Sequence, residues 1–217
     1  QKLDLSSNKL TGRIPETIGN LHSLVFIALS SNELKGLLPK GVSMLQNLQY
    51  FLMDDNPMFI SLPSEFGELQ KLQELRLANS GYSGKIPPTY SKLSNLSTLS
   101  LQNNRLTGEI PASFGSLSHI YHLNLSRNFL EGVVPFNSSF LNRLGKNLDI
   151  SGNPGLCLSP SEANGFNLGV NVCGSNKSGS SILPWEKSEA HQHGIPRPLF
   201  FLLVLLSTMI SVALSNI

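Results

Sequence analysis

The segment from Leu96 to Pro111 reads L-S-T-L-S-L-Q-N-N-R-L-T-G-E-I-P. Its leucines lie eight, five and three residues before Asn104, and a further one lies two residues after it. The alternation around Leu99 and Leu101 has a period of two, which predicts a short strand whose leucine side chains share one face. Asn104 then marks the position at which this strand ends.

The same frame recurs along the chain at a constant step of twenty-four positions. Proline follows this step at Pro15, Pro39, Pro63, Pro87, Pro111 and Pro135. Asparagine follows it at Asn8, Asn32, Asn56, Asn104 and Asn128. Ser80 stands where the step would place a further asparagine, and Asn153 arrives one residue late. A fixed step of this length predicts a repeat architecture in which successive coils stack on one another.

Stacking accounts for the spacing, because one coil cannot bury its apolar face alone. Successive strands would lie parallel and about 4.8 Å apart. The asparagine would turn inward, where its amide satisfies backbone groups of adjacent coils. Ser80 has less hydrogen-bonding capacity, so we expect a locally weakened ladder there.

A second apolar series follows each proline at steps of three residues, as in Ile18, Leu21 and Leu24. Such steps predict a helical or 3₁₀ turn on the convex side, and the glycines and prolines prevent a long helix. Aromatic residues of this series recur at the repeat period, so we interpret them as core residues rather than as a ligand site: Phe66, Tyr90 and Phe114.

The pattern resembles the leucine-rich repeat, L-x-x-L-x-L-x-x-N-x-L. The ending L-T-G-x-I-P, at Leu10–Pro15 and Leu106–Pro111, is similar to the plant extracellular subtype of that family. The resemblance covers residues 1–156. It implies an α/β solenoid, a right-handed superhelix of about seven coils, each of twenty-four positions, with a parallel concave β-sheet and an irregular or 3₁₀ convex side.

The motif N-P-G-L-C at Asn153–Cys157, with Cys173 sixteen residues further on, resembles the carboxy-terminal cap of plant leucine-rich ectodomains. That resemblance implies a disulfide between Cys157 and Cys173 and a cap over residues 157–174. Two free buried thiols are the alternative. A metal site is not expected, because no histidine or further cysteine lies close by at ligand spacing.

Composition argues against several function classes. Charged residues make up 14% of the 217 positions, while leucine alone occupies 39 of them, and the net charge is +2. A chain with so little net charge is not expected to bind nucleic acid. The sequence contains no G-x-S-x-G, Walker, H-E-x-x-H or kinase motif. We therefore predict a non-catalytic protein without cofactor or metal.

Four sequons indicate the secretory route. The pattern N-x-S/T without an intervening proline occurs at Asn95, Asn124, Asn137 and Asn176. Together with the cysteine pair, these candidate glycosylation sites favour an extracellular location. Gln1 opens in mid-repeat, so we expect the sequence to be a fragment, and the absence of a signal peptide carries no information about the compartment.

The composition changes after Gly174. We expect a flexible polar stalk over residues 175–198, followed by a hydrophobic tail over residues 199–217. An apolar tail behind a polar spacer fits a GPI-attachment signal, with Ser178, Gly179 and Ser188 as candidate attachment sites. A single transmembrane span is the alternative, although sixteen uncharged residues are short of the roughly twenty that a span needs.

Outward positions of the predicted strands form a candidate recognition surface, since concave faces of solenoids are common binding faces. The candidate ligand or partner residues on this face are Tyr50, Leu52, Asp54, Glu74, Arg76, Gln102, His122 and Arg127. Tyrosine and arginine are enriched among binding hot spots. Variable exposed positions without a partner are the alternative. A glycan on Asn124 would crowd this face near the later coils and move binding to the earlier ones.

The whole pattern resembles plant receptor-like proteins, in particular the group containing TOO MANY MOUTHS and Piriformospora indica-insensitive protein 2. This resemblance implies a membrane-anchored protein on the extracellular face of the plasma membrane. It would bind a protein or peptide ligand and a receptor kinase co-receptor in development, defence or symbiosis, and the oligomeric state stays open. The alternatives are a secreted inhibitor of a microbial wall-degrading enzyme and a truncated receptor kinase ectodomain.

Overall fold

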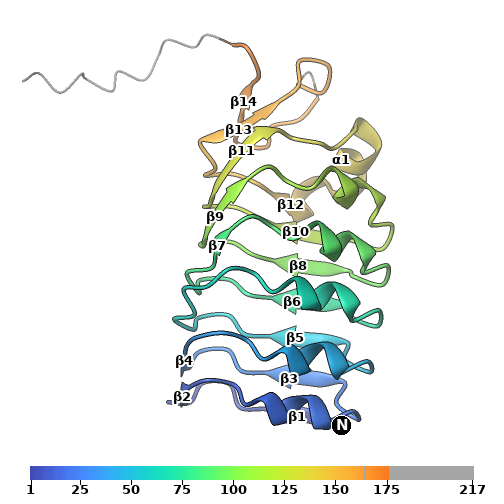
Figure 1. The fold of residues 1–217 in the computed structure, drawn as a ribbon. Helices are drawn as coiled ribbons and strands as arrows, with labels where there is room; N and C mark the ends of the chain where they lie inside the picture. Colours follow the sequence, from blue (N-terminus) through green and yellow to red (C-terminus); the bar gives the residue numbers. More distant parts are fainter. Residues whose placement is uncertain (164, 176–217) are drawn as a thin grey trace, which may run out of the picture. The chain divides into compact units, whose positions relative to one another are not determined.

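The computed structural model describes residues 1–163 and 165–175. Its main feature is a seven-stranded sheet in which every paired strand is parallel to its neighbour (Figure 1). The strands, in their order across the sheet, are β1 (Lys2–Asp4), β3 (Phe26–Ala28), β5 (Tyr50–Leu52), β6 (Glu74–Arg76), β8 (Thr98–Ser100), β10 (His122–Asn124) and β12 (Leu148–Asp149). Sequence order and sheet order agree, as a stack of coils requires.

The register of this sheet follows the repeat. Leu75 pairs with Leu99, and Leu99 pairs with Leu123, each exactly one repeat further along the chain. Leu123 pairs with Leu148, one position beyond the repeat step, because the last coil holds one additional residue. The leucines at the strand centres are buried, and the residues on either side of them point to the opposite, concave face.

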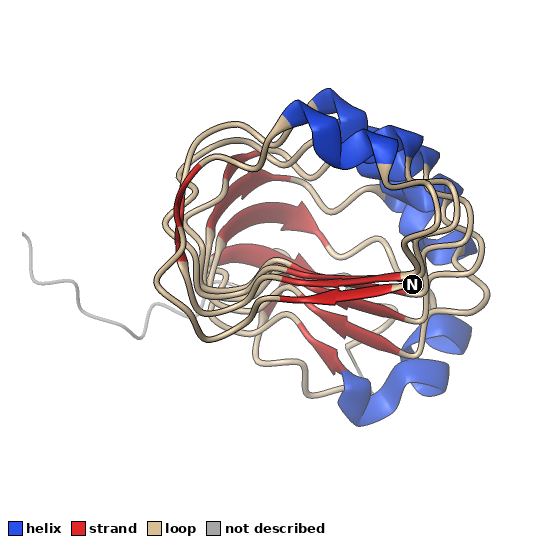
Figure 2. Cartoon of the chain, turned by 90° about the horizontal axis from the view of Figure 1, so that it is seen from below, coloured by secondary structure: helices blue, strands red, loops and turns tan. Residues whose placement is uncertain are grey.

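Short 3₁₀ helices lie opposite these strands, at the turns that follow each repeat proline (Figure 2). Proline occupies the position before each helix, where its fixed φ and missing N–H cost nothing. These helices are η1 (Glu16–Asn20), η2 (Lys40–Met44), η3 (Ser64–Glu68), η4 (Pro88–Lys92) and η5 (Ala112–Ser116). The predicted leucine-rich-repeat solenoid with a 3₁₀ convex side is confirmed.

The last coil departs from this rule. It carries an α-helix, α1 (Ser138–Leu144), followed by the 3₁₀ helix η6 (Gly145–Asn147). Asn137 caps α1, because its side-chain oxygen accepts a hydrogen bond from the N–H of Phe140 at 3.0 Å. Regular spacing in the earlier coils did not predict this helix.

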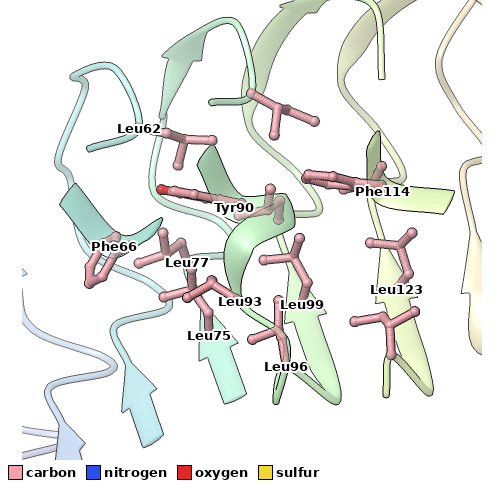
Figure 3. Close-up of a cluster of buried hydrophobic side chains, with 14 of the residues drawn as sticks. Leu62, Phe66, Leu75, Leu77, Tyr90, Leu93, Leu96, Leu99, Phe114 and Leu123 are labelled. Carbon is pink, nitrogen blue, oxygen red and sulfur yellow. The ribbon is translucent and has the colours of Figure 1, made fainter. Parts of the chain in front are cut away.

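The core runs continuously between sheet and helices (Figure 3). Phe66, Tyr90 and Phe114 succeed one another along its convex side and have no exposed surface, which confirms their interpretation as core residues. Phe66 and Tyr90 meet edge to face, with ring centroids 6.4 Å apart. The Tyr90 hydroxyl donates to the carbonyl of Pro63 at 2.9 Å, so its single polar group is satisfied inside the core.

The repeat asparagines form a buried ladder between coils. Asn104 donates to the carbonyls of Leu77 and Leu101 at 2.9 and 3.0 Å, and its side-chain oxygen accepts the N–H groups of Ser80 and Tyr82. Asn32, Asn56, Asn128 and Asn153 repeat the arrangement. The amide thus satisfies backbone groups that the solenoid would otherwise bury without partners.

A second set of strands lies on the lateral side, beyond the asparagines (Figures 1 and 2). One sheet contains β2 (Thr11–Gly12) and β4 (Glu33–Leu34), and another contains β7 (Ser83–Gly84), β9 (Arg105–Gly108), β11 (Phe129–Val133), β13 (Gly155–Leu158) and β14 (Asn171–Val172). No strand forms in residues 57–60 between these sheets. Proline explains the break: Glu33 and Arg105 donate their N–H groups to the preceding coil, whereas Pro57, at the equivalent position, has none.

We call residues 57–60 together with residues 79–82 the irregular junction. The N–H groups of Met58 and Phe59 both turn to the carbonyl of Ser80, at 3.0 and 3.3 Å. Phe59 adopts a left-handed conformation, with φ +48°. The Ser80 hydroxyl donates to the carbonyls of Ala78 and Met53, but no side-chain amide reaches Met58. The expected weakening at Ser80 therefore coincides with a gap in the lateral sheet.

Cys157 and Cys173 form a disulfide with Cα atoms 5.0 Å apart. The bond ties β13 to β14, which pair in parallel with Cys157 opposite Asn171. The segment between the cysteines packs partly buried apolar side chains, including Phe166 and Leu168, against the end of the core. This cap closes the stack at its last coil.

Candidate functional site

Two columns of side chains run along the concave face of the seven-stranded sheet. Pairing in register places each member directly beside the equivalent residue of the next coil. The first column is Lys2, Phe26, Tyr50, Glu74, Thr98 and His122, and the second is Asp4, Ala28, Leu52, Arg76, Ser100, Asn124 and Asp149. The chemistry of this face is therefore set by equivalent positions of successive repeats.

Four of the predicted surface residues lie together on β5 and β6. Tyr50 is opposite Glu74, and Leu52 is opposite Arg76. Tyr50 and Leu52 are both half-buried, so part of each side chain is available to a ligand. Cross-strand neighbours on one face have Cβ atoms only about 5 Å apart, so the four side chains form a contiguous group.

Phe26 extends this group onto β3. Its ring centroid lies 6.0 Å from that of Tyr50, with the planes tilted by 43°. Lys2 places its ammonium 5.6 Å from the centre of the Phe26 ring, within the range of a cation–π contact. The Tyr50 hydroxyl donates to the side-chain oxygen of Gln73 at 3.0 Å, which fixes the direction of the tyrosine.

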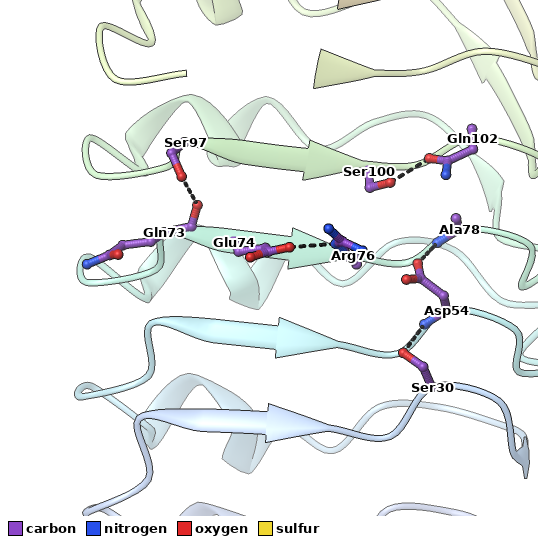
Figure 4. A network of polar contacts seen from close by, with 9 residues as sticks. All are labelled: Ser30, Asp54, Gln73, Glu74, Arg76, Ala78, Ser97, Ser100 and Gln102. Carbon is purple, nitrogen blue, oxygen red and sulfur yellow. Dashed lines mark hydrogen bonds and ion pairs between the residues drawn. The ribbon is translucent and has the colours of Figure 1, made fainter. Parts of the chain in front are cut away.

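The polar end of the group is an ion pair within one strand (Figure 4). The Arg76 Nε lies 2.5 Å from Glu74 Oε1, and the side chains are 46% and 20% exposed. Among the described residues, no acceptor contacts the two terminal nitrogens of Arg76. An exposed pair of this kind contributes little to stability, so its orientation matters more for what the guanidinium can bind.

Asp54 lies one residue beyond Met53, just after β5, and is half-buried. Its Oδ1 accepts the N–H of Ala78 at 2.6 Å, and its own N–H donates to the Ser30 hydroxyl at 3.2 Å (Figure 4). Burial raises the pKa of the Asp54 carboxyl, although the Ala78 hydrogen bond and the charge of Arg76 act in the opposite direction. Asp54 is thus a constrained carboxylate at the border of the group.

The remaining predicted residues lie apart from this group. Gln102 follows β8 and accepts a hydrogen bond from Ser100 at 2.6 Å. His122 lies on β10, two strands away from β6. Arg127 follows β10 in a left-handed turn, with φ +55°. The structure therefore brings Tyr50, Leu52, Glu74, Arg76 and the adjoining Asp54 together and leaves these three outside.

Sequence reasoning missed Phe26 and Ala28, which precede Tyr50 and Leu52 by one repeat. The repeat step contained the signal, since Phe26 and Ala28 lie twenty-four positions before Tyr50 and Leu52. We name Phe26, Ala28, Tyr50, Leu52, Glu74 and Arg76 the concave patch. It has an aromatic and aliphatic part on β3 and β5 and an ionic part on β6.

The candidate modification sites have different surroundings. Asn95 and Asn137 are exposed, while Asn124 is half-buried on β10, and its side-chain oxygen accepts from the N–H and hydroxyl of Ser126. Asn176 and the attachment candidates Ser178, Gly179 and Ser188 lie outside the described residues, as do residues 176–198 of the stalk and the whole tail. Within residues 1–163 and 165–175, no helix is long and apolar enough to cross a membrane.

Across the same described ranges, no three histidine, cysteine or acidic side chains gather where they could hold a metal ion.

Profiles of the Leucine rich repeat family match residues 1–58 and 95–117. Receptor like protein 29 of Arabidopsis thaliana is 65% identical over 55 residues, which are 25% of this chain. The matched part amounts to 12% of that relative, so the chain covers only a small share of its length.

Solved plant ectodomains share the fold. The ectodomain of the Arabidopsis receptor kinase HAESA, in complex with an IDA peptide hormone ligand, matches 73% of this chain and 26% of its own at 31% identity, with a TM-score of 0.64. A chain of the Arabidopsis thaliana BIR3–SERK2 complex is also 31% identical, with 79% of this chain and 72% of that chain covered and a TM-score of 0.52. By its repeats and its fold, the chain is a leucine-rich-repeat solenoid similar to these plant ectodomains.

Proposed function

We propose that this chain is the recognition part of a plant receptor-like protein and that the concave patch binds a peptide or protein ligand. The observation that carries the proposal is the contiguity of Phe26, Tyr50 and Leu52 with the Glu74–Arg76 pair on three adjacent strands. Half-buried aromatic and aliphatic side chains supply apolar contact area, and an arginine with free terminal nitrogens supplies a directional partner for a carboxylate or carbonyl.

The relatives support a protein or peptide as the ligand. HAESA was solved with a peptide hormone, and BIR3 was solved with SERK2. We propose by analogy that this chain binds a peptide or protein on the concave patch and a receptor kinase co-receptor elsewhere on the stack. In this proposal the chain contributes recognition and no catalysis, and a partner kinase carries the signal.

The cellular setting belongs to the same proposal. We place the repeats of residues 1–156 and the cap of residues 157–174 on the extracellular face of the plasma membrane, in the group of TOO MANY MOUTHS and Piriformospora indica-insensitive protein 2. Residues 175–198 would act as a stalk and residues 199–217 as a GPI signal or a span. Release from plant membranes by a phosphatidylinositol-specific phospholipase supports the GPI form, and retention supports the span.

N-linked glycans are proposed at Asn95, Asn124, Asn137 and Asn176. A glycan on Asn124 would occupy the concave face at β10, two strands from β6, and would leave the concave patch open. Peptide mapping of the secreted protein tests occupancy, and an unmodified Asn124 would remove this constraint on where ligands bind.

Binding measurements on two variants test the concave patch. The full chain is screened against synthetic secreted peptides by biolayer interferometry, and the peptides that bind are titrated against Tyr50→Ala and Arg76→Ala. Each variant should weaken binding by at least about tenfold, since hot-spot truncations cost about 2 kcal/mol or more and about 1.4 kcal/mol corresponds to tenfold. Tyr121→Ala and Arg105→Ala, which alter the same residue types outside the patch, should leave affinity unchanged. Equal affinity in all four variants would eliminate the patch as the ligand site.

A further inference from the structure

Phe59, in the irregular junction, is an aromatic side chain that the repeat does not require. It is 66% exposed and has φ +48°, a conformation that is uncommon for a bulky residue. The equivalent residues of neighbouring coils, Lys35 and Ser83, are polar. An exposed aromatic ring held in an unfavourable backbone conformation is a reason to look for function.

Several departures from the repeat coincide at this ring. Pro57 removes the N–H that would join residues 57–60 to β4, and the Ser80 carbonyl then takes the N–H groups of Met58 and Phe59. Gly81 supplies the space for the ring, because a Cβ there would lie 2.4 Å from the Phe59 Cδ1 atom. The ring therefore lies against the backbone of the next coil along its Cδ1–Cε1 edge, and most of the residue stays exposed.

The ring borders a surface hollow of about 530 Å³. The hollow is shallow and open to solvent, so it can receive only one side of a ligand. Its lining consists of Asp55, Asn56, Pro57, Phe59, Asn79, Ser80, Gly81 and Asn103. Aromatic, amide and carboxylate groups from three successive coils therefore meet at one place.

The polar side of the hollow is built from one repeat position. Asp55, Asn79 and Asn103 follow one another one repeat apart, all exposed and all in the left-handed conformation. Asn79 Nδ2 donates to Asp55 Oδ1 at 2.9 Å, which aligns the first two side chains. In the described part of the chain, the second Asp55 oxygen, the Asn79 oxygen and the Asn103 amide have no hydrogen-bond partner.

We propose that this hollow is a binding site for a neutral oligosaccharide, with Phe59 as the stacking platform. The face of an aromatic ring is electron-rich and attracts the weakly positive C–H groups on one face of a pyranose. Carboxylate and amide groups beside the ring can accept from and donate to the hydroxyl groups at the sugar's edge. The repeat spacing of the three polar residues would let successive sugar units follow the stack.

The charge and polarity of the lining favour a neutral oligosaccharide over an acidic sugar. The lining holds one carboxylate, Asp55, and no cationic side chain, so an acidic sugar would be repelled rather than paired. The walls beside the ring combine the apolar Pro57 and Gly81 with the hydrogen-bonding side chains of Asp55, Asn79 and Asn103, a mixture that suits a sugar, which has both C–H faces and hydroxyl groups. The site is distinct from the concave patch, and neither proposal depends on the other.

Isothermal titration calorimetry of the full chain tests the assignment with cellohexaose, laminarihexaose and hexagalacturonate as probes. We expect at least one of the neutral probes to bind and the acidic probe not to bind. Phe59→Ala and Phe59→Asn should each weaken binding by about tenfold or more, as loss of an aromatic contact would. Asparagine tolerates the left-handed conformation, so the second variant removes the ring while preserving the backbone.

Two controls separate the ring from general effects. Phe59→Tyr keeps a stacking surface and should bind like the unmodified chain, and Phe129→Ala removes a similarly exposed phenylalanine from β11 and should change nothing. Far-ultraviolet circular dichroism checks that each variant is folded. Failure of both neutral probes to bind, equal affinity in Phe59→Asn, or preference for hexagalacturonate would overturn the proposal. Tyr50→Ala and Arg76→Ala should bind the sugar probes like the unmodified chain. The proposal for the hollow and the proposal for the concave patch are therefore tested independently.

Discussion

Asn104 and Ser80 occupy the same repeat position one coil apart, and the structure around them differs. Asn104 bridges Leu77, Leu101 and the N–H of Tyr82 with one amide. The Ser80 hydroxyl donates to the carbonyls of Ala78 and Met53 and accepts the N–H of Asn56, but it accepts no N–H of the lateral segment, as the Asn104 oxygen does from Tyr82. Continuous lateral strands accompany the amide and are interrupted beside the hydroxyl. The asparagine amide thus ties the lateral segment of the preceding coil to the core, and at the junction this tie is missing together with the N–H that Pro57 lacks.

The irregular junction lacks the lateral strand pairing of the other coils and exposes an aromatic side chain instead. Where the lateral sheet is unbroken, strands β7, β9, β11 and β13 pair with one another through backbone hydrogen bonds. At the junction, the chain is held by the Ser80 carbonyl and presents the Phe59 ring instead. A repeat protein can accept such a departure because each coil contacts mainly its neighbours, so the defect stays local.

Removing the amide should have the largest effect on stability. Asn104→Ala would leave the buried carbonyl of Leu77 and the buried N–H groups of Ser80 and Tyr82 without partners, while the Leu101 carbonyl keeps its hydrogen bond from Asn128. Since each buried polar group left unpaired costs about 1–3 kcal/mol, we expect a loss of about 3–5 kcal/mol in the free energy of unfolding. Urea denaturation followed by circular dichroism measures it.

Ser80→Ala is the matched variant in the irregular junction. It removes a hydroxyl that donates to Ala78 at 2.7 Å and to Met53 at 3.3 Å and accepts the N–H of Asn56 at 3.3 Å, so a loss of about 1–2 kcal/mol is expected. If Ser80→Ala proved as damaging as Asn104→Ala, the hydroxyl would be replacing the amide fully, and the contrast between the two coils would be wrong.

Two buried tyrosines provide a second contrast of smaller size. Tyr90 and Tyr82 both have no exposed surface, but the Tyr90 hydroxyl donates to Pro63 and the Tyr82 hydroxyl has no partner among the described residues. Tyr90→Phe should therefore lower the free energy of unfolding by about 1 kcal/mol, whereas Tyr82→Phe should leave it unchanged or raise it by up to about 1 kcal/mol.

The same urea titrations measure this pair. Because both substitutions delete one oxygen and keep the ring, core packing is the same in the two comparisons. A destabilisation by Tyr82→Phe equal to that of Tyr90→Phe would show that the Tyr82 hydroxyl is satisfied, and would remove the polar defect from the description of the junction.

The repeat explains which parts of the fold could be predicted. Its constant step determines the register of Leu75, Leu99 and Leu123 and the inward position of Asn104, because every coil must match its neighbours. The helix α1 could not be anticipated in this way. It depends on the cap at Asn137 and on an additional residue that shifts the last coil out of step.

The sequence predicted only those residues of the candidate site that occupy outward strand positions, which recur at the repeat step. Tyr50 and Arg76 were found because outward strand positions follow directly from the alternation. Phe26 was missed although the same step leads to it. Phe59 could not be found by counting, since its exposure results from a missing N–H at Pro57 and a missing side chain at Gly81 acting together. Such a combination becomes visible only when the coils are placed side by side.

The smallest predicted effect concerns Asp54, a carboxylate beside the junction at a position where Ser30 and Ser126 stand in other coils. Burial raises its pKa above the ordinary value of 3.8, so the folded chain holds the Asp54 proton more tightly than the unfolded chain does. Unfolded chains then carry fewer protons than folded ones in this range, and the contribution of Asp54 to stability falls as the pH rises past 3.8.

Two substitutions of Asp54 isolate this titration. Asp54→Asn keeps an oxygen for the N–H of Ala78 but cannot titrate, so its free energy of unfolding should increase relative to the unmodified chain as the pH rises. Asp54→Ala should show the same trend with a constant offset from the lost hydrogen bond. Urea denaturation at a series of pH values tests both, and a difference that does not change with pH would mean that the buried carboxylate is compensated in full by Ala78 and Arg76.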